Sequence, residues 1–427
     1  MQIQEILMQL EQGCFDHTFK MLYGSAPEVL HTQRNRYSNA ILAFQKLYPE
    51  RTEVKIFSAP GRTEIGGNHT DHQHGCVLAA AVNLDVIAVV SFHDEQVIRV
   101  KSEGYPADTV ELTDLSVQAG EAGSASMIRG IAAKFTEMGA KIGGFDAYTT
   151  SDVLSGSGIS SSAAFETLIG TIIDKYYNGS KAGAVEIAKI GQYAENVYFG
   201  KKSGLMDQMV SSVGGFVFID FCDTEQPLIE RYTFNFEDAG YCLCITDTKG
   251  SHADLTDDYV AVPKEMKDVA AYFGAEYLRT VDEEAFYAAI PQLRSTCNDR
   301  AILRAAHFFA ENRRAGEEAK ALSDGDMDAF LSLVRQSGDS SANLLQNLYS
   351  CRKPTEQAIP MGILVSKCVL GDRGAVRVHG GGFAGTIQAF VPLDLADRYR
   401  SAMDDLFGAG SCHKMRIRPA GGLEITQ

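Results

Sequence analysis

Five serines and two glycines gather in residues 155–164, Ser-Gly-Ser-Gly-Ile-Ser-Ser-Ser-Ala-Ala, immediately before an apolar helical pattern. Glycines allow the backbone to approach a phosphate closely, and the N-terminus of a helix offers it unpaired N–H groups and a favourable dipole. The serine hydroxyls add hydrogen-bond donors and oxygen ligands for a metal ion. This segment therefore predicts a phosphate-binding loop, although a loop that only caps a helix would have the same composition.

The loop differs from the common nucleotide-binding motifs. It lacks the Lys of a Walker A loop, and Ser161 stands where the dinucleotide-binding fingerprint has its third glycine. The chain also has no HRD or DFG triplet, which argues against a protein kinase.

Histidines crowd into residues 68–74, where Asn, His, Thr, Asp, His, Gln and His follow one another. Imidazole and carboxylate groups are common metal ligands, so a metal-dependent hydrolase is one interpretation. Against it, the order H-x-D-H-x-H matches none of the metalloprotease or deaminase motifs. One alternative is a turn whose side chains cap backbone groups. Another is a sugar-binding loop whose Asp accepts hydrogen bonds from a pair of hydroxyl groups.

The composition indicates a packed globular chain. Of its 427 residues, 45% are hydrophobic and 22% are charged, which excludes a disordered protein. The formal net charge of −16 disfavours binding to nucleic acid or to an anionic membrane, so we expect small-molecule partners. The nine cysteines form no CxxC pair and the first residues lack a signal-peptide pattern, so we expect a cytoplasmic protein with reduced thiols.

Apolar periodicities predict alternating strands and helices, which is typical of an α/β or α+β chain. Strands are expected at 54–58, 76–92, 147–153, 215–221, 241–248 and 375–379, and helices at 37–47, 126–138, 165–176, 182–199, 203–213, 257–273 and 300–322. Residues 59–61, Ala-Pro-Gly, are expected to form a loop after the first strand, and Ser203 to be the N-cap of its helix. A domain boundary is expected between about 220 and 240.

Taken together, these segments resemble the signature regions of the GHMP sugar and mevalonate kinases, and within them the galactokinase family. Residues 59–72, APGRTEIGGNHTDH, are similar to the family signature PGRVNLIGEHTDY, and residues 155–164 resemble the nucleotide loop GxGLSSSAA. Residues 378–385, VHGGGFAG, resemble the third motif TGGGFGG. Ala194-Glu195 and the segment 203–208, SGLMDQ, look like the family's AE and GxMDQ pair. The resemblance covers most of the chain.

The resemblance implies an α+β fold of two lobes. The N-terminal lobe would be like domain 2 of ribosomal protein S5, the C-terminal lobe would be ferredoxin-like, and the active site would lie in the cleft between them. We place the lobes at 1–235 and 236–427, with the galactokinase signature at about 59–75 and the nucleotide-loop region at about 125–215. The family further implies ATP as co-substrate, Mg²⁺, and phosphoryl transfer to the anomeric hydroxyl of galactose.

Two residues correspond to the family's catalytic positions. Asp207 would receive or orient the proton of the sugar hydroxyl, and its place near a helix start helps to keep it ionised. Arg62 would stabilise the charge that develops on the alkoxide or on the transferring phosphoryl group. The ordinary alternatives are a carboxylate that interacts with the helix dipole and a surface salt bridge.

The resemblance also assigns the phosphates and the metal ion. The ATP phosphates would contact Gly156, Ser157, Gly158, Ser160, Ser161 and Ser162. The metal ligands would be Ser162 and Glu195, since Mg²⁺ prefers oxygen donors. A buried ion pair is the alternative for Glu195.

The residues that fall on sugar-contacting positions are Asn68, His69, Asp71, Gly204 and Tyr259. Tyr259 could equally be an ordinary core tyrosine. The glycines at 380–382 permit close approach of the two lobes, or simply form a hairpin turn.

Two departures from the family pattern lie near the sugar, since Asn68 replaces the family's Glu and His72 replaces its Tyr. Glu64, in place of the family's Asn, is a further departure that marks a divergent branch. Charge-assisted hydrogen bonds are about twice as strong as neutral ones, so losing a carboxylate weakens the grip on a hydroxyl. An Asn can additionally donate, for example to an N-acetyl carbonyl. The reaction type is therefore better specified than the sugar.

The predicted function is that of an ATP-dependent sugar 1-kinase, with galactose as the expected substrate. The alternatives are a kinase for an N-acetylhexosamine or arabinose, and a non-catalytic sugar sensor that keeps the fold. The presence of Ser162 and Ala163 in the second motif, together with Arg62 and Asp207, favours catalysis.

Overall fold

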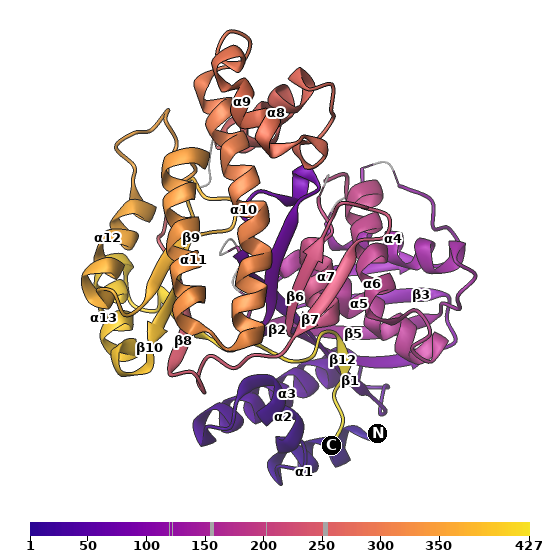
Figure 1. Cartoon of the computed structure of the whole chain (residues 1–427). Coiled ribbons are helices and arrows are strands. Elements are labelled where there is room, and N and C mark those ends of the chain that lie inside the picture. The colour runs from indigo at the N-terminus through magenta and orange to yellow at the C-terminus, as the bar shows by residue number, and fades with distance from the viewer. Residues whose placement is uncertain (119, 122, 154–157, 202, 251–254) are drawn as a thin grey trace.

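The computed structural model describes residues 1–118, 120–121, 123–153, 158–201, 203–250 and 255–427. The described residues form two β-sheets with helices around them, which confirms the predicted α+β class. Figure 1 shows the two sheets beside each other, with the N-terminal helices below the larger sheet. Helices α8 (Thr256–Tyr272) and α9 (Glu283–Leu293) project at the opposite end.

The larger sheet has eight strands among the described residues, and only the pairing of its third strand with its fifth is parallel. The strand order is 12-1-2-5-3-4, with strand 6 paired to strands 2 and 7. The strands are β1 (Lys55–Gly66), β2 (Cys76–His93), β3 (Val97–Ser102), β4 (Ala107–Glu111), β5 (Gly144–Ser151), β6 (Phe216–Asp220), β7 (Leu228–Tyr232) and β12 (Leu423–Glu424).

Helices cover both faces of this sheet. One face carries α4 (Ser124–Glu137), α5 (Ser161–Asn178), α6 (Gly183–Tyr193) and α7 (Met206–Val213). The other carries α1 (Ile3–Glu11), α2 (Asp16–Tyr23) and α3 (Pro27–Leu47). The side chains of β2 alternate accordingly, because Val86 and Ala88 pack with the first group and Ile87 and Val89 with the second.

The smaller sheet is antiparallel with the strand order 11-8-10-9. Its strands are β8 (Tyr241–Asp247), β9 (Ala375–His379), β10 (Thr386–Pro392) and β11 (Cys412–Met415). Helices α12 (Ala358–Leu370) and α13 (Ala396–Phe407) cover one face, and α11 (Met327–Ser340) packs on β9 from the other. Helix α10 (Asp299–Asp324) contacts both α11 and β2, so it bridges the two sheets.

Five short helices complete the described structure. Three are 3₁₀-helices and two are π-helices. They are η1 (Asp71–Gln73), η2 (Ala194–Phe199), η3 (Leu278–Thr280), η4 (Ser341–Leu345) and η5 (Leu393–Leu395). The helix predicted over 182–199 is thus α6 followed by the π-helix η2.

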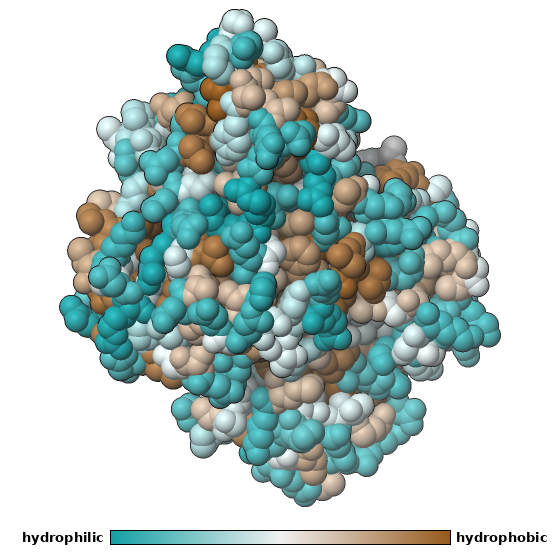
Figure 2. Space-filling view, viewed as in Figure 1, coloured by the Kyte–Doolittle hydropathy of each residue, from teal (hydrophilic) through white to brown (hydrophobic). Residues whose placement is uncertain are grey.

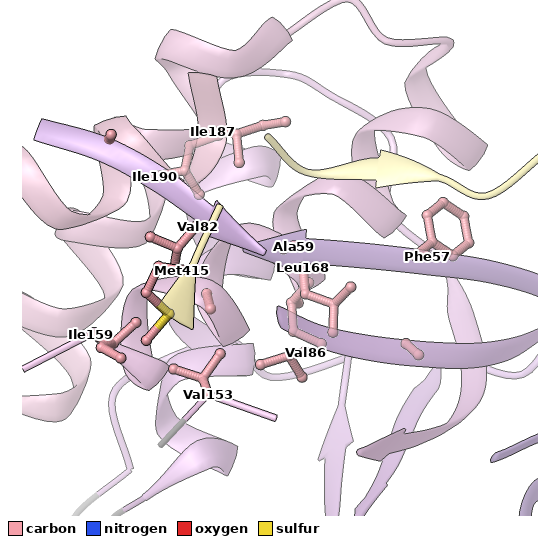
Figure 3. Packing of buried hydrophobic residues seen from close by; sticks show 14 of the residues in the cluster. Phe57, Ala59, Val82, Val86, Val153, Ile159, Leu168, Ile187, Ile190 and Met415 are labelled. Atoms are coloured by element: carbon pink, nitrogen blue, oxygen red, sulfur yellow. The ribbon is translucent and has the colours of Figure 1, made fainter. Parts of the chain in front are cut away.

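One hydrophobic cluster contains side chains from both sheets and their helices. It joins Val82 of β2 and Leu168 of α5 to Phe390 of β10. Figure 3 shows Met415 of β11 beside Val82, with Ile159 close to both. The two lobes therefore share a core.

The C-terminal segment returns to the larger sheet, where β12 pairs with β1 at Phe57 and Ser58. Apart from β12, the larger sheet is built from residues 55–232 and the smaller from 241–415. The lobe division at residue 235 stays a prediction. It assigns β12 to the C-terminal lobe, although β12 pairs with β1 of the larger sheet.

Two local predictions are wrong. Residues 59–61 lie inside β1, and Pro60, which has no N–H, sits where the register with β2 shifts. Ser203 does not cap a helix, because α7 begins at Met206 and the Ser203 hydroxyl donates instead to the buried carboxylate of Glu195. The Ser203 hydroxyl therefore hydrogen-bonds to a buried carboxylate and not to the backbone at the start of the helix.

The molecular surface in the view of Figure 2 is mostly hydrophilic, with hydrophobic residues in small separate patches. In the part of the chain that the structure describes, no helix has the length and apolar character needed to cross a bilayer.

A buried carboxylate joins the N-terminal helices, the larger sheet and the C-terminal segment. Asp85 of β2 is fully buried and accepts hydrogen bonds from Arg36 of α3 at 2.7 Å and from Arg418 at 2.8 Å. Tyr23 and Ser58 also donate to it. Burial by itself would raise the pKa of Asp85, but the two guanidinium groups hold it below its ordinary value.

The substitution Asp85→Ala should leave Arg418 buried without its counter-ion. We expect the free energy of unfolding to fall by about 3–5 kcal/mol, as when one partner of a buried pair is removed. The control Asp397→Ala, at an exposed position, should change it by less than about 0.5 kcal/mol. Urea unfolding followed by circular dichroism measures both, and equal stabilities would contradict this role of Asp85.

Candidate active site

A polar cavity of about 220 Å³ brings together four segments that are far apart in sequence. They are β1, the residues before and within η1, the segment that leads into α7, and the glycine turn after β9. The lining residues are Arg62, Glu64, Asn68, His69, Asp71, Ser203, Gly204, Met206, Asp207, Gly380 and Gly381. The cavity therefore contains both predicted catalytic residues and all the predicted sugar-contacting residues except Tyr259.

Arg62 and Asp207 form a two-point ion pair inside this cavity. Arg62 donates from Nε to Oδ1 at 2.7 Å and from Nη2 to Oδ2 at 2.8 Å. Burial would raise the pKa of Asp207, but the charge and hydrogen bonds of Arg62 lower it below its ordinary value. Asp207 lies in the first turn of α7, where the helix dipole adds to this effect. Asp207 is therefore a carboxylate at neutral pH.

The serine loop, of which the structure describes residues 158–164, reaches the same pair. Ser160 donates to Asp207 Oδ2 at 2.7 Å, and Arg62 donates to the carbonyl of Gly158. Ser160 has a φ of +57° directly before α5, which turns the chain so that its hydroxyl faces Asp207 rather than the helix end. Of the predicted phosphate-binding residues, Gly156 and Ser157 lie outside the described residues.

Asp71, His69 and Gly204 meet on one side of the cavity. A Cβ on Gly204 would lie 2.8 Å from Asp71 Oδ2, so a side chain there would press on the carboxylate. Burial raises the pKa of Asp71 above its ordinary value. His69 donates from Nε2 to the carbonyl of Gly381 at 3.0 Å, and its other ring nitrogen pairs with His72 at 3.3 Å.

The histidine cluster does not form a metal site. His74 stacks on Tyr277 with ring centroids 3.7 Å apart, away from the His69 and His72 pair. No group of three or more His, Cys, Asp or Glu side chains among the described residues is arranged to hold a metal ion. The metal-hydrolase interpretation therefore gains no support.

Asn68 is fully buried and uses its amide on protein groups. Its Nδ2 donates to Glu64 Oε1 at 3.0 Å and to the carbonyl of Gly380 at 2.7 Å. Its Oδ1 accepts from Asn347 at 3.0 Å. Both amide N–H donors are thus taken, which removes the reason for expecting an N-acetyl group to bind there.

Tyr259 lies outside the cavity lining. Its hydroxyl donates to the carbonyl of Gly382 at 2.8 Å, and its ring packs edge-on to Phe383 at 5.3 Å. A Cβ on Gly381 would lie 2.7 Å from the Tyr259 ring, so this glycine is what lets the ring support the turn. The position of Tyr259 indicates support of the glycine turn, and its contact with sugar stays a prediction.

Two buried carboxylates lie beside the serine loop. Glu195 forms an ion pair with Lys201 at 2.8 Å and accepts from Gln208 at 2.9 Å. The same Gln208 nitrogen donates to Glu166 at 3.0 Å. Burial and the nearby charge of Glu195 raise the pKa of Glu166 to about 8.

The oxygens of Glu195 and of the serine hydroxyls are donors of the kind preferred by Mg²⁺, the metal that the resemblance implies. Glu166 Oε1 beside them is buried and has no hydrogen-bond partner among the described residues. In the structure, Glu195 forms an ion pair with Lys201, as the alternative interpretation expected. The role of Glu195 as a metal ligand stays a prediction.

A second cavity, of about 420 Å³, begins at Ser161 and Ser162. The larger apolar side chains of its lining are Tyr105, Met127, Phe165 and Phe199. Sequence reasoning could not find these residues, because scattered apolar side chains have the same pattern as core. The serine loop therefore lies between a polar cavity and a partly apolar one.

Sequence reasoning also missed the charged residues behind the polar cavity. Arg377 of β9 is fully buried and donates to Glu64 at 2.6 Å, and its other near carboxylate, Glu311 of α10, lies at 3.6 Å. The available signal was an Arg between two valines in a predicted strand. A buried Arg requires a carboxylate partner, which the pattern of β9 alone does not identify.

Comparison with known proteins identifies two segments of the chain. Residues 42–92 match the galactokinase galactose-binding signature, and residues 110–215 match the GHMP kinases N terminal domain. The chain is similar to the structure of Lactococcus lactis galactokinase complexed with galactose, with a TM-score of 0.78 and 21% identity over 91% of this chain and 99% of that one.

Two other solved structures share the architecture. A D-glycero-D-manno-heptose 1-phosphate kinase from Bacteroides thetaiotaomicron has a TM-score of 0.59 at 15% identity, over 87% of this chain and 99% of that chain. Methanococcus jannaschii mevalonate kinase has a TM-score of 0.61 at 13% identity, over 86% and 98%. These likenesses confirm the predicted two-lobed fold.

Behind the signature segment, Glu318 of α10 is fully buried, and neither of its carboxyl oxygens has a hydrogen-bond partner among the described residues. A Cβ on Gly66 would collide with this carboxyl group, so the glycine makes room for it. Burial and the neighbouring Glu311 raise the pKa of Glu318 well above its ordinary value of 4.5. The raised pKa and the absence of a hydrogen-bond partner for either oxygen among the described residues both favour the protonated form of Glu318 in the folded protein.

This raised pKa predicts a stability that falls as the pH rises. Above about pH 4.5 the unfolded chain releases the proton that the folded protein keeps, so stability is fully present below that pH and is lost toward the folded pKa, by about 1.4 kcal/mol per pH unit. Glu318→Gln is neutral throughout and should lose less stability between about pH 5 and pH 8. Urea unfolding at both pH values measures the difference. The adjacent exposed control Glu317→Gln should behave like the wild type, and an identical loss in Glu318→Gln would contradict a protonated Glu318.

Proposed function

We propose that this chain, which has the GHMP kinase fold, is an ATP-dependent sugar kinase that phosphorylates the anomeric hydroxyl of galactose. The observation that carries the proposal is the Arg62–Asp207 pair at 2.7 and 2.8 Å, in one cavity with Asp71 and His69 of the signature segment. The match of residues 42–92 to the galactose-binding signature supports galactose as the sugar.

The charges of the polar cavity support a neutral substrate with many hydroxyl groups. Glu64, Asp71 and Asp207 line the cavity, and its one lining guanidinium, Arg62, is already paired with Asp207. Carboxylates accept hydrogen bonds from hydroxyl groups but repel a phosphate or a second carboxylate. A sugar is therefore favoured over a sugar phosphate or an organic acid.

The roles of the pair follow from its electrostatics. The ionised Asp207 accepts a hydrogen bond from the anomeric hydroxyl and aims its oxygen at the γ-phosphorus. The hydroxyl oxygen forms its bond to the γ-phosphorus as the bond from phosphorus to the β–γ bridging oxygen breaks. The hydroxyl proton passes to Asp207 late in this transfer and from there to solvent, and ADP leaves. The lowered pKa of Asp207 favours orientation over early proton abstraction, which suits a loose transition state that needs little basic catalysis. Arg62 offers positive charge to the transferring group.

The nucleotide would approach through the serine loop. The N-terminus of α5 and the hydroxyls of Ser161 and Ser162 suit its phosphates, and the second cavity, with Tyr105 and Phe165 in its lining, suits an adenosine group. Ser162 and Glu195 would hold Mg²⁺, which neutralises phosphate charge when bound.

The other sugar substrates and the sensor role are less well supported. The amide of Asn68 is committed to Glu64, Gly380 and Asn347, so it offers no donor to an N-acetyl group. A sensor would not need the Arg62–Asp207 pair with Ser160 directed at it. Arabinose stays an alternative.

The substitution Asp207→Ala should lower kcat with galactose by about 10²- to 10⁴-fold, the range for a lost group that handles a proton. Nucleotide affinity should be largely spared, because Asp207 does not line the second cavity. Galactose-dependent ADP release with MgATP measures turnover, and calorimetry with a non-hydrolysable ATP analogue measures binding.

Asp324→Ala is the matched control, since Asp324 is an exposed acid at the far end of α10. A panel of hexoses, pentoses and N-acetylhexosamines in the same assay identifies the sugar. Undiminished turnover by Asp207→Ala would contradict its assigned role, and the absence of turnover with every sugar would contradict the proposed function.

Removing an aromatic ring from the second cavity should weaken nucleotide binding alone. Tyr105 is 64% exposed, so Tyr105→Ala should fold normally. The lost stacking interaction has a free energy of about 0.5–1.5 kcal/mol, so the KM for ATP should rise about twofold to tenfold. The KM for sugar should stay unchanged. Tyr272→Ala, which removes an exposed ring outside both cavities, should leave both constants unchanged. A raised KM for sugar instead of ATP would contradict this assignment.

A further inference from the structure

Two departures from the family signature are the two halves of one exchange. The signature has an amide at position 64 and a carboxylate at position 68, whereas this chain has Glu64 and Asn68. The structure places the two side chains in contact, with Asn68 Nδ2 donating to Glu64 Oε1 at 3.0 Å. The carboxylate and the amide have therefore changed places without leaving the cavity, since both residues line it.

Glu64 is directed into the cavity by the strand that carries it. Arg62 and Glu64 are two residues apart on β1 with no register shift between them, so their side chains leave the same face. Thr63 leaves the opposite face, where its hydroxyl lies 3.0 Å from His379 Nε2. Successive residues of a strand rise by about 3.3 Å, so the carboxylate stands roughly 7 Å along the cavity wall from the catalytic Arg.

Arg377 supplies the counter-charge for the carboxylate in its new place. It donates to Glu64 Oε1 at 2.6 Å from a fully buried position. The backbone of Glu64 is also fixed, because Gln388 donates to its carbonyl at 2.8 Å. The side chain is thus preorganised on its Oε1 side before any ligand arrives.

Asn68, in contrast, is fully committed to protein groups. Its two N–H donors go to Glu64 and Gly380, and its oxygen accepts from Asn347. These contacts join β1 to the turn after β9 and to the segment after η4. Asn68 therefore acts on the shape of the cavity through its neighbours.

We propose that Glu64 is the specificity-determining acceptor for a ring hydroxyl of the sugar remote from the reacting one, and that Asn68 is a positioning residue. This inference rests on the proposed function, because it concerns the sugar of the same site. From the sequence alone, this carboxylate acceptor would be expected at position 68, where this chain has an amide instead.

The test combines one isosteric variant with sugars that each lack one hydroxyl. We would measure kcat/KM by ADP release for galactose and for its 2-, 3-, 4- and 6-deoxy forms. In the wild type, one deoxy form should lose about tenfold to one hundredfold, the worth of a hydrogen bond to a charged group. Glu64→Gln should lose a similar factor with galactose and should scarcely distinguish galactose from that one deoxy form.

A purely structural role for Glu64 would give another pattern. Glu64→Gln would then lower kcat/KM for all five sugars by one common factor, and this result would overturn the inference. Glu64→Asp, which keeps a charge beside Arg377, serves the same test if the Gln variant does not fold. The control Glu50→Gln, at an exposed acid, should keep the wild-type profile.

The exchange itself provides a second test. Asn68→Glu alone places two carboxylates where the side chains now lie 3.0 Å apart, and should abolish most of the activity. The double variant Glu64→Asn with Asn68→Glu restores the family arrangement and should recover activity relative to Asn68→Glu. No recovery would contradict the exchange. If the wild type neither turns over nor binds any of these sugars, the proposed function fails; turnover with an unchanged deoxy-sugar profile in Glu64→Gln overturns this inference alone.

Discussion

The two-point ion pair between Arg62 and Asp207 sets the geometry on which the rest of the site depends. It joins β1 to the first turn of α7 across 145 residues of sequence, and two parallel N–H···O bonds fix both the distance and the plane of the groups. The same guanidinium donates to the carbonyl of Gly158, and Ser160 donates to the same carboxylate. The polar cavity and the serine loop are thus aligned through one pair of side chains.

Charges buried behind this pair hold the two sheets in one relative position. Arg377 comes from β9 of the smaller sheet, Glu64 from β1 of the larger one, and Glu311 from the helix between them. Separating the sheets would leave each charge without its partner in a medium of low dielectric, which is costly. The shared apolar core reinforces this constraint, so the cavity walls have a defined spacing before ligands bind.

Sequence reasoning found the residues whose function requires a particular local motif. Arg62, Asp71 and Asp207 sit in short segments rich in glycine and polar side chains, and these segments meet in the cavity. It did not find the residues that support them, because Arg377 and Glu318 come from elements whose apolar pattern looks like ordinary core. One signal was present, since Glu311 and Glu318 are seven residues apart on a helix face with buried Ala315. Charged groups at core-facing positions indicate a buried network, but not its members.

The pairing of β12 with β1 has a consequence for how the chain is made. During synthesis the larger sheet emerges from the ribosome first, yet the outer edge of β1 at Phe57 and Ser58 waits for residues 423–424, which follow the whole smaller sheet. Domains generally fold as they are translated, and open strand edges invite mispairing. In this chain the lobe that is translated first is completed only after residues 423–424 have been made, so its nascent form keeps an open edge on β1 until then.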